Sequence, residues 1–339
     1  MAPALQRELL VVTGKGGVGK TTIASALGLL ASERGSSTIV VEVGEQARLP
    51  ELLGAPAGEA GVEHELRPNL SSLSIDLDRA LMEWLQSLGG RVSGRLLASS
   101  STFQYFAAAA PGAKELVSMV KIWELTQARR WRGRGRRYDL VILDAPATGH
   151  ALGMLGSPRT FGAIARVGPI AGQAERVRDL LEDPERSSYL AVAHATEMAV
   201  SETLELQDKL REQLGRELDA VLVNGVLPQR FSAAELERVA ILASASAPDR
   251  RRPRAGAGAG AKRPGNASAG GFSAARSAEV KRSALGAAEA VSARSRAQRN
   301  QLARLRRRSV EVIPVPFQFT DELELQSVLR IADHLQRRL

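Results

Sequence analysis

The chain has 339 residues, of which 44% are hydrophobic, so it can bury a sizeable core as one large α/β domain or two modest ones. It contains no cysteine, which excludes disulfides, thiolate metal sites and cysteine catalysis. No run of about 18 apolar residues occurs, and the first residues lead straight into an expected strand, so we expect a cytoplasmic protein without a membrane span.

The formal net charge of +9 is concentrated in one segment. Residues 248–308 hold 16 Lys and Arg against three acids, a net of +13, which leaves −4 for the rest of the chain. The stretch 247–277 is rich in Ala, Gly, Arg and Pro and cannot bury enough apolar surface to offset its ordering entropy, which predicts a disordered basic insertion. Phe272 is the only aromatic residue in this region, so we expect no specific nucleic-acid partner; an electrostatic contact with acidic lipid or polymer is the alternative.

Short apolar or β-branched runs recur along the chain and are separated by helical patterns. The runs predict strands at 8–13, 37–43, 70–76, 138–144, 188–194, 218–224 and 310–316. The periodicity between them predicts helices at 20–35, at 201–215, at 274–308 and from about Asp321. Strands that alternate with helices at this spacing predict an α/β fold whose mostly parallel sheet is covered by helices on both faces.

Two regions depart from this alternation. Residues 80–130 and 157–185 have helical patterns without strands, which predicts an α-helical subdomain inserted around the carboxyl edge of the sheet. We therefore expect residues 1–339 to form a single domain that carries this insertion. The stretch 96–125 is apolar enough to line a groove for a client helix, although internal packing is the simpler explanation for apolar residues at helical spacing.

The first predicted strand ends in the segment GKGGVGKTT, residues 14–22. This segment fits G-x-x-x-x-G-K-[ST] between a strand and a helix, which predicts a P-loop whose backbone N–H groups surround phosphate oxygens. We expect Lys20 to reach the β- and γ-phosphates and Thr21 to offer its hydroxyl to a metal ion, so the expected cofactors are ATP and Mg²⁺. The expected nucleotide-binding residues of the loop are Gly14, Lys15, Gly16, Gly17, Val18, Gly19, Lys20, Thr21 and Thr22.

The loop contains a second lysine, Lys15, which phosphate binding does not require. Because the loop wraps phosphates with its backbone, a lysine four residues ahead of Gly19 points outward. The complete segment resembles the deviant Walker A motif, whose signature lysine crosses a dimer interface to the partner's nucleotide and neutralises charge on the transferred phosphoryl group. The resemblance implies a nucleotide-sandwich dimer in which Lys15 is catalytic; a solvated loop lysine is the alternative.

A second motif, DAPATGH, follows the predicted strand 138–144. Asp144 ends that strand, where a Walker B acid holds Mg²⁺ together with Thr21. The motif resembles switch II of the arsenical pump-driving and tail-anchored-protein targeting ATPases. The resemblance implies a P-loop ATPase in which Gly149 lets the loop move and His150 reports that movement; for His150, a loop histidine bonded to backbone is the alternative.

Shorter segments carry the same resemblance and imply further roles. TEMAVSETLEL (196–206) resembles the start of a helix that places Glu202 near the nucleotide of the dimer. VLVNG places Asn224 where adenine is read, and IPVP (313–316) places Pro314 against the other side of the base. The implied partners are a second copy or a paralogous ATPase chain, together with a hydrophobic-helix client or a membrane protein.

The chain departs from the family in three respects. The absence of cysteine excludes the thiol site of the arsenite pump and the interchain zinc site of the targeting factor, and only one P-loop is present. The switch I stretch 41–54 places Gly44 where the family has an Asp that orients the attacking water. Glu42 and Glu45 flank Gly44; Glu45 is the catalytic candidate because a loop shift brings it to a water, and a solvated loop is the alternative for both.

Three functions stay open on these residues. The first is an ATP-hydrolysing dimeric switch that couples nucleotide-driven closure to a client or membrane partner. The second is a nucleotide-dependent binding module with little hydrolysis, because Gly44 replaces the switch I Asp. The third is a partition-type ATPase that uses the basic segment on DNA, which the motif DAPATGH argues against.

Overall fold

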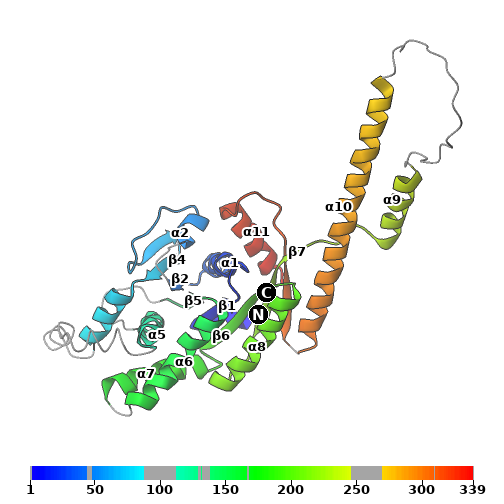
Figure 1. Ribbon diagram of the computed structural model, residues 1–339. Coiled ribbons are helices and arrows are strands. Elements are labelled where there is room, and N and C mark those ends of the chain that lie inside the picture. Colours follow the sequence, from blue (N-terminus) through cyan, green and yellow to red (C-terminus); the bar gives the residue numbers. More distant parts are fainter. Residues whose placement is uncertain are drawn as a thin grey trace, which may run out of the picture. The chain divides into compact units, whose positions relative to one another are not determined.

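One eight-stranded sheet organises the chain (Figure 1). The computed structural model describes residues 2–43, 48–87, 112–128, 131, 138–165, 168–245, 269–308 and 310–338. The strands lie in the order β3-β4-β2-β5-β1-β6-β7-β8, and every neighbouring pair is parallel except β3 and β4. The strands are β1 (Leu9–Gly14), β2 (Thr38–Val43), β3 (His64–Arg67), β4 (Leu70–Ile75), β5 (Leu140–Asp144), β6 (Ser187–His194), β7 (Ala220–Val226) and β8 (Glu311–Pro316).

The seven predicted strands all form, while β3 was not predicted. The sequence of β3, HELR, has no apolar run and lies partly exposed at the edge of the sheet, so its pattern carries no strand signal. The strand exists because the chain turns back on β4 through Asn69, whose φ of 62° is one that Asn tolerates better than most residues.

Helices cover both faces of the sheet, as predicted. The helical elements are η1 (Ala2–Gln6), α1 (Lys20–Glu33), α2 (Leu49–Leu52), residues 77–87, α5 (Ala113–Thr126), α6 (Thr148–Ala165), α7 (Pro169–Glu182), α8 (Glu197–Leu214), α9 (Ala233–Ala245), α10 (Ala269–Arg306) and α11 (Leu325–Gln336). α1 and α11 pack on one face, and α5, α6, α7 and α8 pack on the other. The last helix begins at Leu325 rather than near Asp321.

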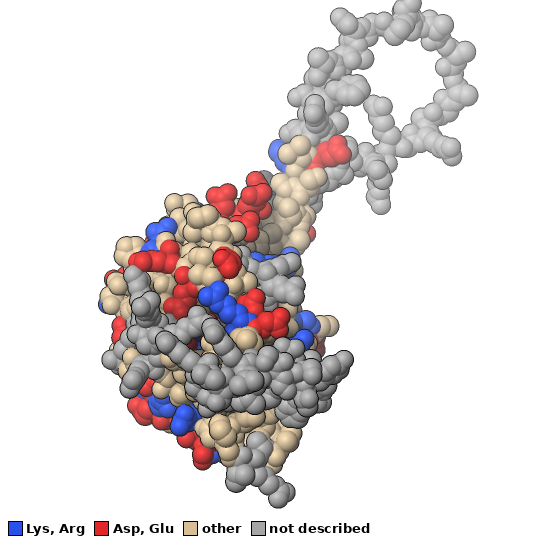
Figure 2. Space-filling model, turned by 90° about the vertical axis from the view of Figure 1, so that its left-hand side faces the viewer, with Lys and Arg blue, Asp and Glu red and all other residues tan. Residues whose placement is uncertain are grey.

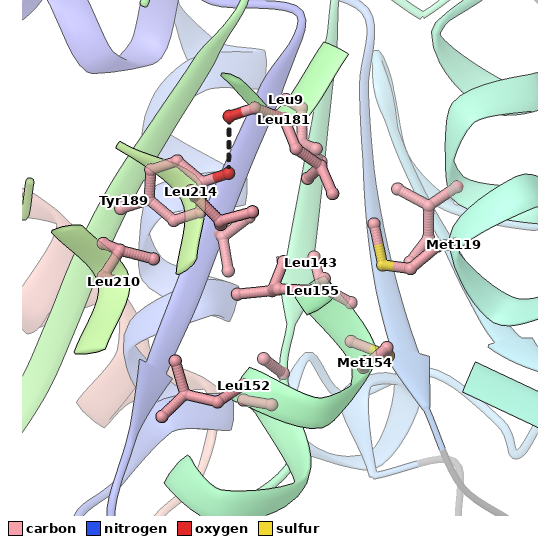
Figure 3. Packing of buried hydrophobic residues seen from close by; sticks show 14 of the residues in the cluster. Leu9, Met119, Leu143, Leu152, Met154, Leu155, Leu181, Tyr189, Leu210 and Leu214 are labelled. Carbon is pink, nitrogen blue, oxygen red and sulfur yellow. Dashed lines mark hydrogen bonds between the residues drawn. The ribbon is translucent and has the colours of Figure 1, made fainter. Parts of the chain in front are cut away.

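Alternate residues of the central strand face the two cores. Leu9 and Val11 belong to the core under α5 to α8, whereas Leu10 and Val12 belong to the core under α1 and α11. Figure 3 shows the first of these cores, in which the hydroxyl of the fully buried Tyr189 donates a hydrogen bond of 2.8 Å to the Leu181 carbonyl. A strand that is apolar on both sides is typical of a buried parallel sheet, so the predicted fold class is confirmed.

The predicted helical insertion is seen only in part. Residues 77–87 and α5 are helical, and residues 88–111 lie outside the described residues. Lys121 of α5 joins the two helices through ion pairs of 2.9 Å to Glu83 and, within α5, 3.1 Å to Glu124. The described part of the predicted client groove, 112–125, is mostly buried in the core against the sheet, so its apolar residues serve internal packing. The second helical region, predicted at 157–185, begins earlier, at Thr148.

The described chain separates into two compact units, residues 1–226 with 301–339, and residues 227–300. The first unit contains the whole sheet. The second contains α9 and most of α10, and α10 begins at Ala269, inside the stretch predicted to be disordered, because its alanine-rich sequence favours a helix. The rest of that stretch, up to 268, lies outside the described residues. Acidic and basic side chains lie interspersed on the face drawn in Figure 2. None of the helices in the described part of the chain combines the length and hydropathy needed to cross a bilayer.

Two helical glycines give a test of the packing of α1. A Cβ atom at Gly28 would lie 2.7 Å from Val40 Cγ2 and 3.1 Å from Leu70 Cδ1, so we expect Gly28→Ala to lower the free energy of unfolding by about 1–3 kcal/mol. Gly153 of α6 has no described atom within 4 Å of such a Cβ, so we expect Gly153→Ala to raise the free energy of unfolding by up to about 1 kcal/mol. Urea unfolding measures both; equal midpoints for the two variants would show that α1 does not pack closely on β2 and β4.

Candidate functional site

The glycine-rich loop lies between β1, at the centre of the sheet, and α1. Gly14, Gly17 and Gly19 have φ angles of 143°, 79° and 91°, which side-chain-bearing residues rarely adopt. Gly19 is the N-cap of α1 and has no side chain to occupy the first N–H groups of the helix. These N–H groups and the positive end of the helix are therefore available to an anion at this position.

Close contacts explain why two of these positions require glycine. A Cβ at Gly14 would lie 2.1 Å from the Val192 carbonyl oxygen, and one at Gly19 would lie 2.4 Å from Asn224 Nδ2. Around Gly16 and Gly17, by contrast, no atom of the described chain lies within 4 Å of such a Cβ. The loop is thus packed against its neighbours on one side and open on the other, which is the shape that a phosphate cradle needs.

Asn224 of β7 lies next to this loop. It is the last residue of β7 that pairs with β6, and its Nδ2 donates a hydrogen bond of 2.9 Å to the Val18 carbonyl. Pro314 lies within β8, opposite Val223. The predicted roles of Asn224 and Pro314 in holding adenine stay predictions.

Two aromatic residues beyond β8 were not predicted as site residues. Phe317 and Phe319 are exposed, and their ring centres lie 4.9 Å apart in an edge-to-face arrangement. The backbone N–H of Phe317 donates to the Val226 carbonyl at 3.0 Å, which places this pair at the end of β7 that carries Asn224. The signal in the sequence was Phe317, an aromatic residue directly after the last strand.

The side chain of Lys20 lies over the loop. Its Nζ donates a hydrogen bond of 3.1 Å to the Lys15 carbonyl. Burial lowers the pKa of Lys20, and the negative charge of Asp144 opposes this effect. A partly desolvated ammonium group gains free energy when an anion arrives, so Lys20 is poised to pair with phosphate.

Thr21 and Asp144 form the candidate metal site. Thr21 Oγ1 donates a hydrogen bond of 2.6 Å to Asp144 Oδ2, while Asp144 Oδ1 is buried and has no hydrogen-bond partner among the described residues. Burial raises the pKa of Asp144 to about 6, against the effects of the Thr21 hydrogen bond and of Lys20. A hydroxyl beside an unsatisfied carboxylate oxygen is a donor set that suits Mg²⁺, so these residues fit the predicted ion. The described residues include no cluster of three or more His, Cys, Asp or Glu, and phosphate and water oxygens would have to complete the coordination shell.

Lys15 lies on the surface and contacts α8 of its own chain. Its Nζ is 2.5 Å from Glu202 Oε1 and 3.0 Å from Met198 Sδ. The side chains of Lys15 and Glu202 are 39% and 35% exposed, and an ion pair at such a position contributes about 0–1 kcal/mol. Lys15 and Glu202 also line a groove of about 290 Å³ together with Gly16, Thr148, Gly149 and Leu152. Lys15 therefore lies at the surface, its contact with Glu202 is weak, and its predicted role across a dimer interface stays a prediction.

The structure corrects the predictions for the flanking motifs. Gly149 and His150 lie in the first turn of α6 and not in a loop, because only the three residues 145–147 separate Asp144 from the start of the helix at Thr148. Gly44 and Glu45 lie outside the described residues. Glu42 is 7% exposed and not solvated, because β2 continues to Val43 and carries Glu42 inside the sheet.

The buried carboxylate of Glu42 has its own partners. Oε1 accepts a hydrogen bond from the backbone N–H of Arg48 at 3.2 Å, and Oε2 accepts one from that of Leu49 at 3.3 Å. Burial raises the pKa of Glu42 to about 7, the hydrogen bonds oppose the shift, and the charge of Asp144 adds to it. The register of β2 and β5 pairs Glu42 with Asp144, so two buried acids stand side by side at the sheet edge that carries the loop.

A glycine loop between the central strand and a helix, followed in space by an acid at the end of the neighbouring strand, defines a P-loop nucleotide-binding protein. Sequence comparison assigns the family: the profile of the anion-transporting ATPase family matches residues 7–168 and 163–239, and the chain belongs to that family.

Individual relatives agree with this assignment. The chain is 32% identical over 240 residues to ATPase BagA of Mycobacterium tuberculosis, with 69% of each chain covered. It is 27% identical over 241 residues to a putative arsenical pump-driving ATPase of Halobacterium salinarum, which covers 68% of this chain and 37% of that protein. It is 26% identical over 285 residues to ATPase GET3 of Mycosarcoma maydis, with 70% and 81% covered. The resemblance predicted from the two motifs is confirmed at the level of the family.

The raised pKa values predict how metal binding depends on pH. Mg²⁺ competes with the proton on Asp144, whose pKa is about 6, and the neighbouring Glu42, with a pKa of about 7, adds to this competition while Lys20 opposes it. We expect the Mg²⁺ concentration for half-maximal nucleotide binding to be nearly constant above pH 8 and to rise as the pH falls, by up to about tenfold per pH unit below 6. Fluorescent-nucleotide binding titrated with Mg²⁺ at pH 5.5, 7 and 8.5 measures this dependence.

Asp144→Asn is the matched control, because an amide does not exchange a proton in this range. We expect this variant to bind Mg²⁺ less tightly than wild type, so that it needs a higher Mg²⁺ concentration. Its Mg²⁺ affinity is expected not to depend on protonation at position 144. A wild-type Mg²⁺ requirement that is the same at pH 5.5 and 8.5 would contradict the assignment of Asp144 as a metal ligand.

Proposed function

We propose that this chain is an ATP-binding and ATP-hydrolysing switch that works as a dimer. The observation that carries the proposal is the buried Oδ1 of Asp144, which has no hydrogen-bond partner within the described chain and lies next to Thr21 at the start of α1. Membership of an ATPase family supports the same activity. ATP is the proposed substrate, and Mg²⁺ is the proposed metal ion.

In this proposal, different residues bind the phosphates, the metal ion and the base. The N–H groups around Gly17, Gly19 and the first turn of α1 bind the phosphate oxygens, and Lys20 exchanges its bond to the Lys15 carbonyl for the terminal phosphates. Thr21 and Asp144 hold the ion, which, when bound, neutralises charge on the β- and γ-phosphate oxygens. Asn224 and Pro314 flank the proposed adenine site.

The proposed dimer gives Lys15 its role. On assembly, Lys15 leaves Glu202 and reaches the nucleotide of the partner subunit, where its charge stabilises the transferred phosphoryl group in the way that an arginine finger does. Glu202, once released, lies close to the shared nucleotide. The exposed, weak ion pair between the two side chains supports this exchange. The partner is a second copy or a paralogous ATPase chain.

The client on which the switch acts is proposed from the resemblance to the same family. Closing and opening of the dimer would act on a hydrophobic helix or a membrane protein, and the chain would work in the cytoplasm. Metalloid chemistry of the thiol type is excluded because the chain has no cysteine.

A second candidate function rests on Gly44. Glycine cannot orient an attacking water, so the chain could act as a nucleotide-dependent binding module whose own hydrolysis is very slow, unless Glu45 or a paralogous partner supplies the missing acid. The two candidates share the binding site and differ in turnover alone.

Two lysine variants test the proposal. Lys20→Ala removes the phosphate-binding cation, so we expect nucleotide affinity and turnover to be lost together. Lys15→Ala removes only the cross-subunit charge, so we expect nucleotide affinity within a few-fold of wild type and turnover reduced by about 10³-fold, the lower end for an arginine finger. Phosphate release, nucleotide binding and sedimentation with and without nucleotide measure these effects. Lys114→Ala, an exposed lysine on α5, is the matched control with wild-type behaviour expected.

Three results would separate the candidates. Equally slow phosphate release by wild type and Lys20→Ala would remove hydrolysis by the homodimer and leave the binding module. Loss of nucleotide affinity in Lys15→Ala as severe as in Lys20→Ala would contradict the cross-subunit role. A chain that stays monomeric with saturating nucleotide and Mg²⁺, alone and with paralogous chains, would remove the dimer.

A further inference from the structure

Two buried carboxyl groups stand at the same edge of the sheet. Glu42 and Asp144 are 7% and 8% exposed, and they are paired residues of the adjacent parallel strands β2 and β5. Paired residues of a parallel sheet project from the same face, so the two acids are neighbours and each raises the cost of charge on the other. The mechanism proposed above uses Asp144 and leaves Glu42 without a role.

Glu42 lies between the start of α2 and strand β5. Each carboxylate oxygen accepts one backbone N–H, from Arg48 and from Leu49, at the first turn of α2. A carboxylate has about four lone-pair sites, so both oxygens keep the capacity to accept a further donor. Toward β5 the neighbouring group is Asp144, which is itself an acceptor and whose free Oδ1 faces no donor from the described residues. Two acceptors side by side repel each other unless a cation, bound water or a proton on one of them lies between them.

We infer that Glu42 is a positioning residue of the magnesium site, an outer-shell carboxylate that accepts hydrogen bonds from metal-bound water and links the site to the start of α2. This inference rests on the proposed nucleotide site. Thr21 and Asp144 supply few ligands, so water completes much of the coordination shell, and outer-shell acceptors hold such water in place. Glu42 is a buried acid beside Asp144 on the described part of this edge.

The same carboxylate couples the metal site to the backbone that follows switch I. Because Glu42 holds the N–H groups of Arg48 and Leu49, any change in the hydrogen bonds that it makes to metal-bound water also changes its hold on α2. The carboxyl group of Glu42 thus lies inside the sheet, two residues before Gly44.

Glu42→Gln tests the inference, because it keeps the shape and one acceptor oxygen and removes the charge. We expect the Mg²⁺ concentration for half-maximal binding of a non-hydrolysable ATP analogue to rise by about 10-fold or more, and binding of the same analogue in EDTA to stay within about twofold of wild type. Asp219→Asn is the matched control: Asp219 also accepts a backbone N–H, from Tyr189 at 2.7 Å, but lies at the amino end of β7. The control is expected to keep the wild-type Mg²⁺ requirement.

A second measurement on the wild-type chain covers the case in which Glu42→Gln does not fold. Amide hydrogen exchange at Arg48 and Leu49 is expected to be slower with analogue and Mg²⁺ than with analogue and EDTA. A Glu42→Gln variant with an unchanged Mg²⁺ requirement overturns the inference, whatever its stability. Equal exchange rates at the two amides with Mg²⁺ and with EDTA would overturn the inference as well.

The two proposals fail in different ways. If wild-type protein binds no Mg²⁺-dependent nucleotide analogue, the proposed function is wrong and the role of Glu42 is lost with it. If wild type binds the analogue with Mg²⁺ and Glu42→Gln does so equally well, the proposed function stands and Glu42 is only the cap of α2.

Discussion

The carboxylate of Asp144 is buried while only Oδ2 is bonded within the described chain, and the rest of the site is arranged around this unsatisfied charge. Burying a charged group without full hydrogen bonding costs free energy, and the pKa of about 6 records that cost. A cation at Oδ1 removes the penalty, so ligand binding and stability of the fold draw on the same interaction. Binding of a cation at this site would therefore stabilise the fold, which couples ligand binding to the conformation of the chain.

The order of strands in the sheet assembles the site from distant parts of the chain. β5 lies next to β1, so Asp144 stands beside the glycine loop, and β2 on the far side of β5 adds Glu42. On the other flank β7 lies beyond β6 and brings Asn224 to the Val18 carbonyl. All these groups sit at the carboxyl ends of parallel strands, where ligands of open α/β sheets bind. A substitution that shifts β5 would thus displace Asp144, whereas one that shifts β7 would displace Asn224.

Local patterns in the sequence were sufficient for the parts of the fold whose signal is short. Each buried parallel strand is a largely apolar run and the P-loop is a contiguous motif, so both could be predicted, the strands to within two residues at each end. β3 and the burial of Glu42 could not, because they depend on neighbours: β3 on the turn at Asn69, and Glu42 on β5 and α2. A glutamate near a strand end looks the same in sequence whether it is solvated or enclosed. The start of α6 within the switch II motif was not predicted, because Gly149 suggested a loop.

The two lysines of the loop differ in how firmly the chain holds them, and this difference bears on what can regulate the site. Lys20 is half-enclosed and bonded to the backbone of its own loop, so its position belongs to the folded chain. Lys15 contacts Glu202 and Met198 at the surface, and its ion pair with Glu202 contributes about 0–1 kcal/mol and is weakened by salt. A triphosphate on a second subunit presents far more negative charge than one carboxylate, and in a closed interface that charge is less screened. In the proposed dimer, exchange of Lys15 from Glu202 to such a phosphate would therefore lower the free energy. Under that proposal, one chain alone binds the nucleotide, and the second chain adds the positive charge that the transferred phosphate needs.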